Sequence, residues 1–431
     1  MIRRNDITQF IKRIAEEPYR VFFPLGILFG AVGATHWFFY SVGWIPAYSG
    51  LFHSTVQTQG YLGCFVIGFL LTAMPRFASA PPATSGELAG FLLWTFGIFG
   101  FSVFGLTVFS ELCFIGWLLG LARFAVRRVL RVKKSGESHS PPVEFVWIPV
   151  AILHGLVGAL LVIASEMKWM GSWSVGVGKP MAEQGFLLAV VTGVGGFLAP
   201  RLMGRFQVLK PSEVCSVEKS LQIRKRRVVI HLLAGLLLFT SFWLEGFSWF
   251  AAGYGLRALV VTGELFWTCS LIFPPRVSDF YAKLLWVSLW MTALGNWAVL
   301  VFPKQRTALL HLVFLGGFSL MTFAMATVVT LSHSGEAPKL HRPLPVLRIV
   351  LAGISTALGL RLLAPFFPDA YFRLLGAASL GWLLAGGGWL FFALPRLFRF
   401  PDKEEFERFH DEAKRRISNL GNPPFTSERG R

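Results

Sequence analysis

The sequence has little charge for its length. Only 15% of its 431 residues are Asp, Glu, Lys or Arg, whereas 54% are hydrophobic. Soluble domains carry about a quarter charged residues, because charge is what covers their surface. This scarcity excludes an ordinary soluble protein.

Acidic residues are scarcer still than basic ones. The chain has 23 Asp and Glu against 41 Lys and Arg, which gives a formal net charge of +18. The basic residues lie in short connections between apolar segments, and that placement is typical of membrane topology, since Lys and Arg collect in cytoplasmic loops. We therefore expect no nucleic-acid partner.

Cysteine is also rare and widely spaced. The four residues Cys64, Cys113, Cys215 and Cys269 form no C-x-x-C pair, and three of them fall inside apolar segments. This indicates neither a disulfide framework nor a zinc knot. Residues 1–18 are polar and basic without a cleavage-type ending, so we expect no cleavable signal peptide.

Long apolar runs fill most of the chain. Runs of roughly 20 residues are long enough to cross about 30 Å of hydrocarbon as helices. They predict an all-α, polytopic integral membrane protein whose partner is the lipid bilayer. The twelve expected spans are 20–41, 51–74, 88–108, 110–130, 145–165, 182–203, 228–246, 249–272, 281–302, 308–331, 346–366 and 371–394.

The distribution of basic residues predicts the orientation. With both termini in the cytoplasm, all but seven of the 41 Lys and Arg residues fall on the cytoplasmic side. Four are expected in outer loops (Lys168, Lys179, Lys304 and Arg306), and three within spans or at their ends (Arg257, Arg361 and Arg373).

We expect three regions: a cytoplasmic amphipathic N-terminal segment at 1–19, the membrane domain at 20–395, and a cytoplasmic amphipathic tail at 396–431. A shift of 125 residues brings Gln59-Gly60 onto Gln184-Gly185 and Pro75-Arg76 onto Pro200-Arg201. The second and sixth spans are therefore predicted to be equivalent, and the tenth is their expected third counterpart. Twelve spans then divide into units at about 20–130, 145–272 and 281–394.

Polar side chains gather near the outer ends of several spans. Intramembrane polar groups usually face the interior of a bundle or a cavity. His53 and His311 lie at matching depth on the second and tenth spans, and we predict that they bind one haem or metal ion. The same layer supplies candidate cavity or supporting groups at His36, Gln57, Gln59, Gln184 and Asn296.

Helical spacing refines this hypothesis. A step of 100° places His53, Gln57 and Gly60 on one stripe of the second span. Gly60 and the Gly316-Gly317 pair are expected to leave room for a flat ligand. His333 lies 22 residues after His311, or about 33 Å along a helix, so it would belong to a separate site at the inner face.

Two alternatives stay open. A membrane histidine is often a hydrogen-bonded packing residue, and His53 and His311 could have this role instead of binding a ligand. Arg257 and Glu264 share a face of the eighth span about 10 Å apart and would flank a cavity, unless Arg257 extends its head group towards water.

Several motifs resemble the NnrS family. The second span reads His53-x6-Gly60, followed by Gly68-Phe-Leu-Leu-Thr-Ala-Met-Pro75. The tenth reads His311-x4-Gly316-Gly317, then Leu320-Met321-Thr322, and ends in His333-Ser-Gly335. The opening Pro18-Tyr-Arg20-x-Phe22-Phe23 is similar as well, and the likeness covers essentially the whole chain.

The resemblance implies a twelve-span protein of the bacterial inner membrane that contains haem and copper. It also implies a role in nitric oxide metabolism, denitrification or protection against nitrosative stress, with nitric oxide or a nitrosylated small molecule as partner. The implied cofactor ligands are His53, His311 and His333. Many members carry His-x-His-Glu where this chain reads His53-Ser54-Thr55-Val56, and an Arg where it has Val328. Copper is therefore less supported than haem.

Other functions fit less well. A transporter without a redox cofactor is the main alternative, because internal repeats and intramembrane polar groups are typical of that class. Its substrate site would, however, lie nearer the midplane. A haem–copper oxidase is rejected, because no second histidine accompanies His53. The residues assign no catalytic side chain and leave open whether the protein is an enzyme.

Overall fold

The structure is a computed structural model, and it describes residues 4–78, 80–134, 141–205 and 217–400. Within these ranges the chain forms α-helices and short 3₁₀ and π segments. The predicted C-terminal tail at 396–431 lies almost entirely outside the described residues.

The helices of the first third are α1 (Arg4–Glu16), α2 (Tyr19–Ser41), α3 (Gly50–Thr55), α4 (Gly63–Phe77), α5 (Ser85–Val103) and α6 (Thr107–Lys134). The middle third holds α7 (Trp147–Glu166), α8 (Trp173–Pro180), α9 (Phe186–Val190), α10 (Gly196–Leu202), α11 (Val217–Gly246) and α12 (Phe250–Cys269). The last third holds α13 (Phe280–Val301), α14 (Arg306–His311), α15 (Leu320–His333), α16 (Pro345–Leu363) and α17 (Tyr371–Leu397).

Shorter segments in the described parts of the chain continue or join these helices. Four are π-helical: η1 (Val56–Leu62), η3 (Met181–Gly185), η4 (Val191–Gly195) and η7 (Leu312–Ser319). Five are 3₁₀ turns: η2 (Val143–Val146), η6 (Pro303–Gln305), η8 (Ala337–His341), η9 (Ala364–Phe366) and η10 (Pro368–Ala370).

The π segments join flanking α-helices into three continuous composite helices. We call them span 2 (Gly50–Phe77), span 6 (Trp173–Leu202) and span 10 (Pro303–His333). In each, a π segment lies between flanking α-helices, close to the end at which the span begins.

Eleven helices in the described residues are long and apolar enough to cross a membrane. This confirms a polytopic all-helical membrane protein. The expected eighth span, 249–272, corresponds to α12, which contains Arg257 and Glu264 and is not among the eleven. The count of twelve therefore stays a prediction.

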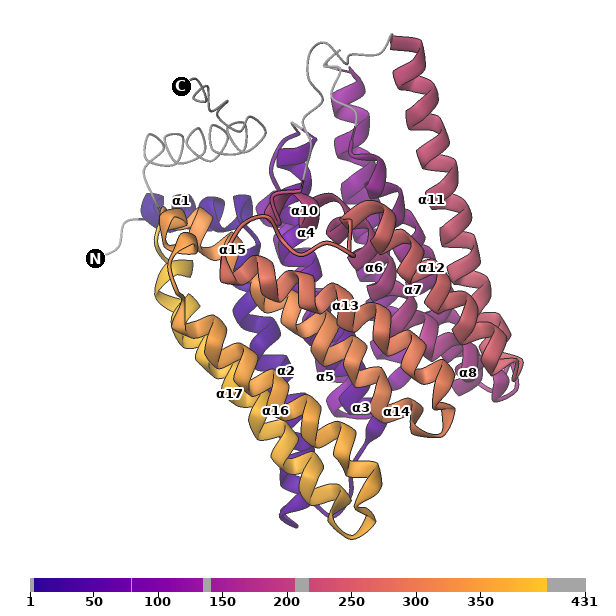
Figure 1. Cartoon of the computed structure of the whole chain (residues 1–431). Coiled ribbons are helices and arrows are strands. Elements are labelled where there is room, and N and C mark those ends of the chain that lie inside the picture. Colours follow the sequence, from indigo (N-terminus) through magenta and orange to yellow (C-terminus); the bar gives the residue numbers. More distant parts are fainter. Residues whose placement is uncertain (1–3, 79, 135–140, 206–216, 401–431) are drawn as a thin grey trace, which may run out of the picture.

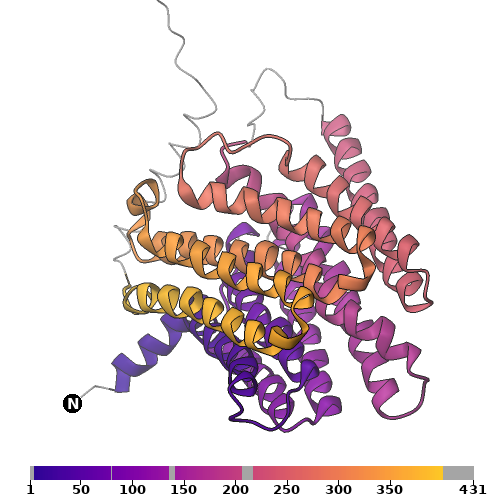
Figure 2. The same cartoon turned by 60° about the horizontal axis from the view of Figure 1, so that its bottom comes forward.

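The helices run roughly side by side as one bundle (Figure 1). We call the end that holds α1 the terminal side, and the end that holds the connections 42–49 and 302–305 the distal side. Helix α6 packs against α7, α12 against α13, and α17 against α2, so the described helices close into a ring. Figure 2 shows α1 at the terminal side, projecting beyond the edge of the bundle.

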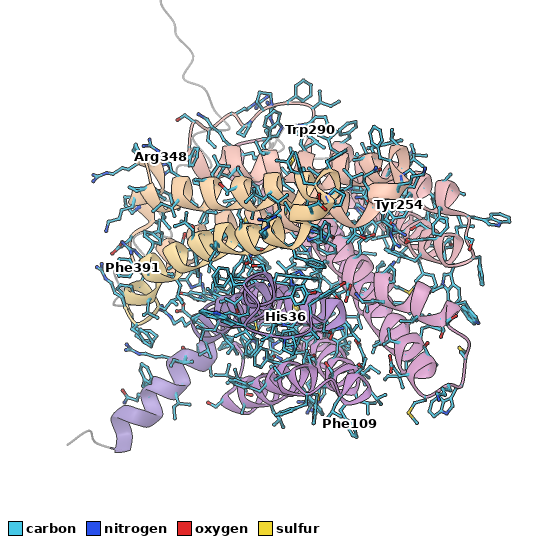
Figure 3. All side chains as sticks on the ribbon, turned by 90° about the horizontal axis from the view of Figure 1, so that it is seen from below. His36, Phe109, Tyr254, Trp290, Arg348 and Phe391 are labelled. Atoms are coloured by element: carbon cyan, nitrogen blue, oxygen red, sulfur yellow. The ribbon has the colours of Figure 1, made fainter. Side chains whose placement is uncertain are left out.

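Apolar side chains cover the outside of the bundle. Phe391 is 85% exposed, and Figure 3 shows Phe109 and Phe391 at its rim. Tryptophans of the distal connections are also exposed (Trp44, Trp169 and Trp249). Such a surface suits lipid, with aromatic rings at the membrane–water interface.

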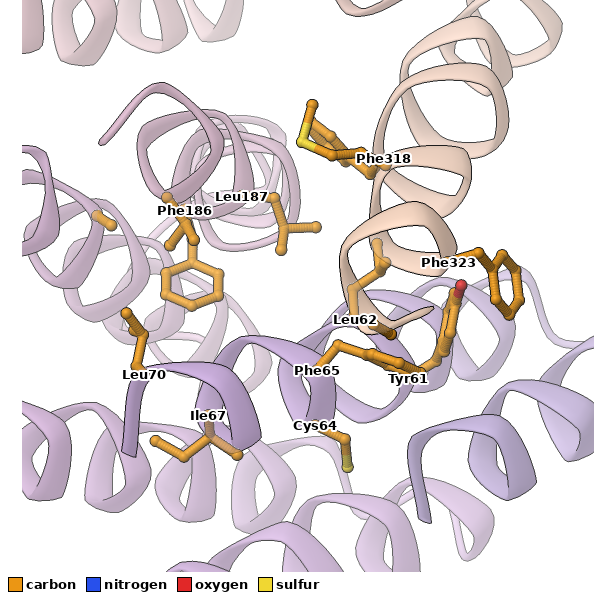
Figure 4. Packing of buried hydrophobic residues seen from close by; sticks show 14 of the residues in the cluster. Tyr61, Leu62, Cys64, Phe65, Ile67, Leu70, Phe186, Leu187, Phe318 and Phe323 are labelled. Carbon is orange, nitrogen blue, oxygen red and sulfur yellow. The ribbon is translucent and has the colours of Figure 1, made fainter. Parts of the chain in front are cut away.

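The interior is packed where spans 2, 6 and 10 face one another. Leu62 of span 2, Leu187 of span 6 and Phe318 of span 10 are buried and lie between the three spans (Figure 4).

Close helix contacts in the interior depend on glycine. A Cβ at Gly33 of α2 would meet Val56 of η1, one at Gly158 of α7 would meet Ala182 of η3, and one at Gly295 of α13 would meet Val313 of η7. Small residues at such contacts let membrane helices approach closely.

Candidate functional site

A cavity of about 590 Å³ opens among the distal halves of spans 2, 6 and 10. Parts of α2, α16 and α17 complete its wall. Its volume lies within the range of small-molecule sites, about 300–1,000 Å³. Its polar lining side chains include His53, Gln57, Lys179, Glu183, Gln184, Arg306, His311, Arg361 and Tyr371.

His53 is held against α2. Its Nδ1 lies 2.9 Å from the carbonyl oxygen of Gly33. A carbonyl can only accept, so Nδ1 carries the proton and Nε2 keeps a free lone pair. Gln57 donates in the same way to the carbonyl of Gly30, at 2.8 Å. Two side chains of span 2 are thereby fixed by two backbone oxygens of α2.

His311 has the same arrangement on span 10. Its Nδ1 donates to the carbonyl oxygen of Thr307, one turn earlier, at 2.7 Å. Its Nε2 accepts a long contact of 3.4 Å from Nε of Arg361. The structure thus brings His53 and His311 into one cavity, each with Nδ1 occupied by the backbone.

Arg361 closes the cavity from the last turn of α16. Only 9% of the residue is exposed. Its Nη1 donates to the hydroxyl of Tyr371 at 3.1 Å. Among the described residues it forms no ion pair with a carboxylate.

Lys179 links spans 2 and 6 at the cavity wall. Its ammonium group lies 2.8 Å from both carboxylate oxygens of Glu183, one turn later, and 2.6 Å from the hydroxyl of Ser54. The expectation that Lys179 lies in an outer loop is wrong. The residue lies inside α8, because the turn that pairs it with Glu183 continues the helix beyond the apolar run.

A second charged network extends from the cavity into the bundle. Nη2 of Arg257 pairs with Glu245 at 2.6 Å, and its Nη1 donates to Gln184 at 2.5 Å. Arg306, which lines the cavity, pairs with the same Glu245 at 2.5 Å and donates to Tyr254 at 2.9 Å. Two guanidinium groups therefore share one carboxylate.

Other predicted site residues lie away from the cavity. The amide of Gln59 donates to both oxygens of buried Glu111 on α6, at 3.0 and 3.2 Å. Asn296 donates to Thr292 of its own helix at 2.8 Å. His36 accepts from the backbone of Ser49 at 2.7 Å and thus fixes the connection after α2; Figure 3 shows it from the distal side.

The expected flanking pair on α12 is divided between two networks. Arg257 reaches Glu245, whereas Glu264 lies 2.9 Å from Nδ1 of His231. Neither Arg257 nor Glu264 lines the cavity.

His333 lies on the terminal side, far from His311, as its spacing requires. Its Nδ1 is 2.8 Å from Glu17, and Nη1 of Arg76 is 2.7 Å from its Nε2. Arg20 pairs with the same Glu17 at 2.6 Å and donates to the carbonyl of Leu397 at 2.8 Å. These contacts join the start of α2 to the ends of α4, α15 and α17.

The glycines expected beside the ligand face neighbouring helices. A Cβ at Gly60 would meet Phe29 of α2, and one at Gly316 or Gly317 would meet Met291 or Thr292 of α13. None of the three lines the cavity. Gly316 and Gly317 permit close packing against α13, whereas a Cβ at Gly60 would make only an ordinary contact with Phe29. That the three glycines leave room for a ligand stays a prediction.

The main cation of the site is not evident from the sequence pattern. Arg361 stands out there only as a basic residue in or near a span. A signal is nevertheless present, because an arginine at the predicted outer end of a span runs against the cytoplasmic bias of basic residues. Its pairing with Tyr371, across the turn between α16 and α17, depends on the tertiary fold.

The fold and the cavity together define a class of protein. A ring of long apolar helices with a lipid-type exterior, enclosing a cavity with charged and imidazole side chains, defines a polytopic integral membrane protein with an internal cavity. The model of the family described as NnrS protein matches residues 13–400. The chain belongs to the NnrS family. A comparison with curated proteins found no match.

Proposed function

We propose that this NnrS-family membrane protein binds haem in the distal cavity and acts in nitric oxide metabolism or in protection against nitrosative stress. The observation that supports this most is the pair of histidines. His53 and His311 come from different spans, line one cavity, and each donate Nδ1–H to a backbone carbonyl. Histidine ligands of metals usually have their second nitrogen engaged in this way.

The available residues fit haem better than a bare metal ion. Haem iron needs only one or two axial side chains, and imidazole is a common one. No group of three or more His, Cys, Asp or Glu side chains that could hold a metal ion occurs in the described residues. Copper sites built from protein ligands alone typically use about three, such as His₂Cys. Copper is therefore not part of the proposal.

The two histidines are not equally suited to ligation. Nε2 of His53 makes no hydrogen bond with the described residues, so its lone pair is free. Nε2 of His311 receives the contact from Arg361, which ligation would replace. His53 is thus the stronger candidate to hold the haem iron, and His311 would be a second ligand or a hydrogen-bond acceptor in the same cavity.

Bound haem would supply an iron position at which a diatomic molecule such as nitric oxide can coordinate. The backbone carbonyls of Gly33 and Thr307 fix the two imidazole rings that would hold it, and Gln57 braces span 2 against α2. The apolar packing below Leu62 and Phe318 closes the cavity towards the terminal side.

The test is a visible spectrum of the full chain purified in detergent. We expect a Soret band in the wild type, strongly reduced in His53→Ala and reduced or shifted in His311→Ala. The matched control is His36→Ala, because His36 lies at similar depth but does not line the cavity. His333→Ala should also keep the band, because its contacts lie on the terminal side. Full haem content in both His53→Ala and His311→Ala would refute the shared site.

The transporter alternative is decided by the same preparation. A colourless protein that takes up no haem would favour it. The cavity would then be a solute site, and its excess of cationic side chains would select an anion.

A further inference from the structure

The charges around the cavity do not cancel. Lys179 is matched by Glu183 within span 6. Arg257 and Arg306 share the single carboxylate of Glu245, which leaves one positive charge in excess. Arg361 has no carboxylate partner in the described part of the chain and contributes a second.

Of these charges, that of Arg361 is the more costly to bury. A guanidinium group does not lose its proton in proteins, so burial cannot neutralise it. Burying a charge without a counter-charge is costly. Yet its polar partners among the described residues are neutral, namely the hydroxyl and ring of Tyr371 and the His311 ring, and its Nη2 makes no hydrogen bond to them.

The position of Arg361 shows where the missing charge belongs. It lines the same cavity as His53 and His311. Its unused donors therefore face space that a ligand can fill. Guanidinium groups bind carboxylates and similar oxyanions through two parallel hydrogen bonds.

We propose that Arg361 is the anion anchor of the cavity, which binds a ligand carrying a carboxylate or an equivalent planar oxyanion group. The identity of the ligand rests on the proposed function: haem carries two propionate carboxylates, matching the two excess positive charges. A small free oxyanion such as nitrite offers the same chemistry to Arg361 without a porphyrin.

A purely structural role for Arg361 predicts a different behaviour. If Tyr371 and His311 were its purpose, replacing it would destabilise the protein. If it is an unpaired charge that a ligand neutralises, Arg361→Gln should leave the ligand-free protein as stable as the wild type or more stable. Ligand binding should nevertheless become weaker.

The experiment compares two porphyrins of different charge state at the propionates, two carboxylates in one and two neutral methyl esters in the other. The full-length wild type, Arg361→Gln and Arg373→Gln are titrated in detergent with iron protoporphyrin IX and with its dimethyl ester. Arg373 is the matched control, because it is exposed and donates to the carbonyl of Asp369 in its own turn. We expect the wild type and the control to prefer the diacid by about tenfold or more, the ratio for one charged hydrogen bond. Arg361→Gln should lower that preference by about this factor and keep only what the second excess charge contributes.

A wild type without preference for the diacid, or an Arg361→Gln variant that keeps it in full, overturns the proposal. If neither porphyrin binds, the proposed haem function fails, and a second measurement decides on Arg361. Nitrite should then raise the thermal unfolding midpoint of the wild type and of Arg373→Gln but not of Arg361→Gln. An equal response in all three proteins, or none, overturns the anion anchor as well.

Discussion

Glu245 is expected to be one of the most sensitive residues of the bundle. Its side chain is nearly fully buried and accepts from Arg257 at 2.6 Å and from Arg306 at 2.5 Å. Tyr254 donates to it as well, at 3.2 Å. Glu245→Gln keeps the shape but removes the charge. Arg257, which is fully buried, would then have only neutral partners.

The expected magnitude follows from the burial. Removing one partner of a buried ion pair leaves an uncompensated charge and lowers the free energy of unfolding by about 3–5 kcal/mol. Removing both charges is far less costly, since buried pairs are often replaced by apolar groups with little loss. The Glu245→Gln/Arg257→Met double variant should therefore be more stable than Glu245→Gln alone, with an interaction energy of about 1–3 kcal/mol.

The assay is denaturant or thermal unfolding of the purified full chain in one detergent, run as a double-mutant cycle. Glu166→Gln is the control, because Glu166 is exposed at the end of α7. It should stay within about 0.5 kcal/mol of the wild type. If Glu245→Gln is as stable as this control, or if the two substitutions add without interaction, the reasoning about the buried network is wrong.

Three further predictions concern the terminal side, helix packing and topology. Burial raises the pKa of Glu17, but His333 and two neighbouring arginines outweigh it and hold that pKa well below its usual range. Its stabilisation is complete above the unfolded value of about 4.3 and is lost as pH falls further, so Glu17→Gln should unfold earlier at pH 7 and lose less stability on acidification. Gly158→Ala places a Cβ 2.5 Å from a backbone nitrogen of the neighbouring helix; it should cost about 1–3 kcal/mol, whereas Gly263→Ala, in open space, should not destabilise. A reporter fused to the C-terminus should be active only if it is a cytoplasmic reporter; periplasmic activity would reverse the topology.

The spans could be predicted from the sequence because the rule that forms them is local. A chain in hydrocarbon must satisfy its own backbone, so a long apolar run becomes a helix wherever it occurs. The rule fails at the ends of helices, where polar residues continue the helix by pairing with each other. Span 6 accordingly begins at Trp173 rather than at 182, and the Lys179–Glu183 pair lies inside it.

The faces of the helices were harder to predict, because span 2 is not a regular α-helix. A single stripe of His53, Gln57, Gly60 and Cys64 requires 100° per residue throughout. The i→i+5 hydrogen bonds of η1 accommodate extra residues per turn, and each extra residue rotates the rest of the helix by about 100° relative to a regular α-helix. His53 and Gln57 line the cavity while they bond to backbone carbonyls of α2, and Gly60 and Cys64 pack against α2 outside the cavity lining.

Charge pairing was beyond the reach of sequence patterns. Gln59 meets Glu111, and Gln184 meets Arg257, over 52 and 73 residues of chain. No periodicity of one helix encodes such a partner. A missing partner cannot be predicted from one helix either. That no carboxylate lies near Arg361 among the described residues becomes visible only when all surrounding helices are in place.

The π segments lie at the cavity, which indicates that they have a role in shaping it. Each of spans 2, 6 and 10 has one near its distal end, and each contributes cavity-lining residues from it: Gln57 and Tyr61 from η1, Glu183 and Gln184 from η3, and Phe314 and Ser319 from η7. Segments of this kind are rare and occur frequently at functional sites. A regular α-helix would carry later residues of each span round to other faces, so π segments in all three spans tie the shape of the cavity to the packing below it. A one-residue deletion in such a segment would therefore disturb both the cavity and the apolar packing. The π segments in this way hold polar side chains in the membrane interior without loosening its apolar core.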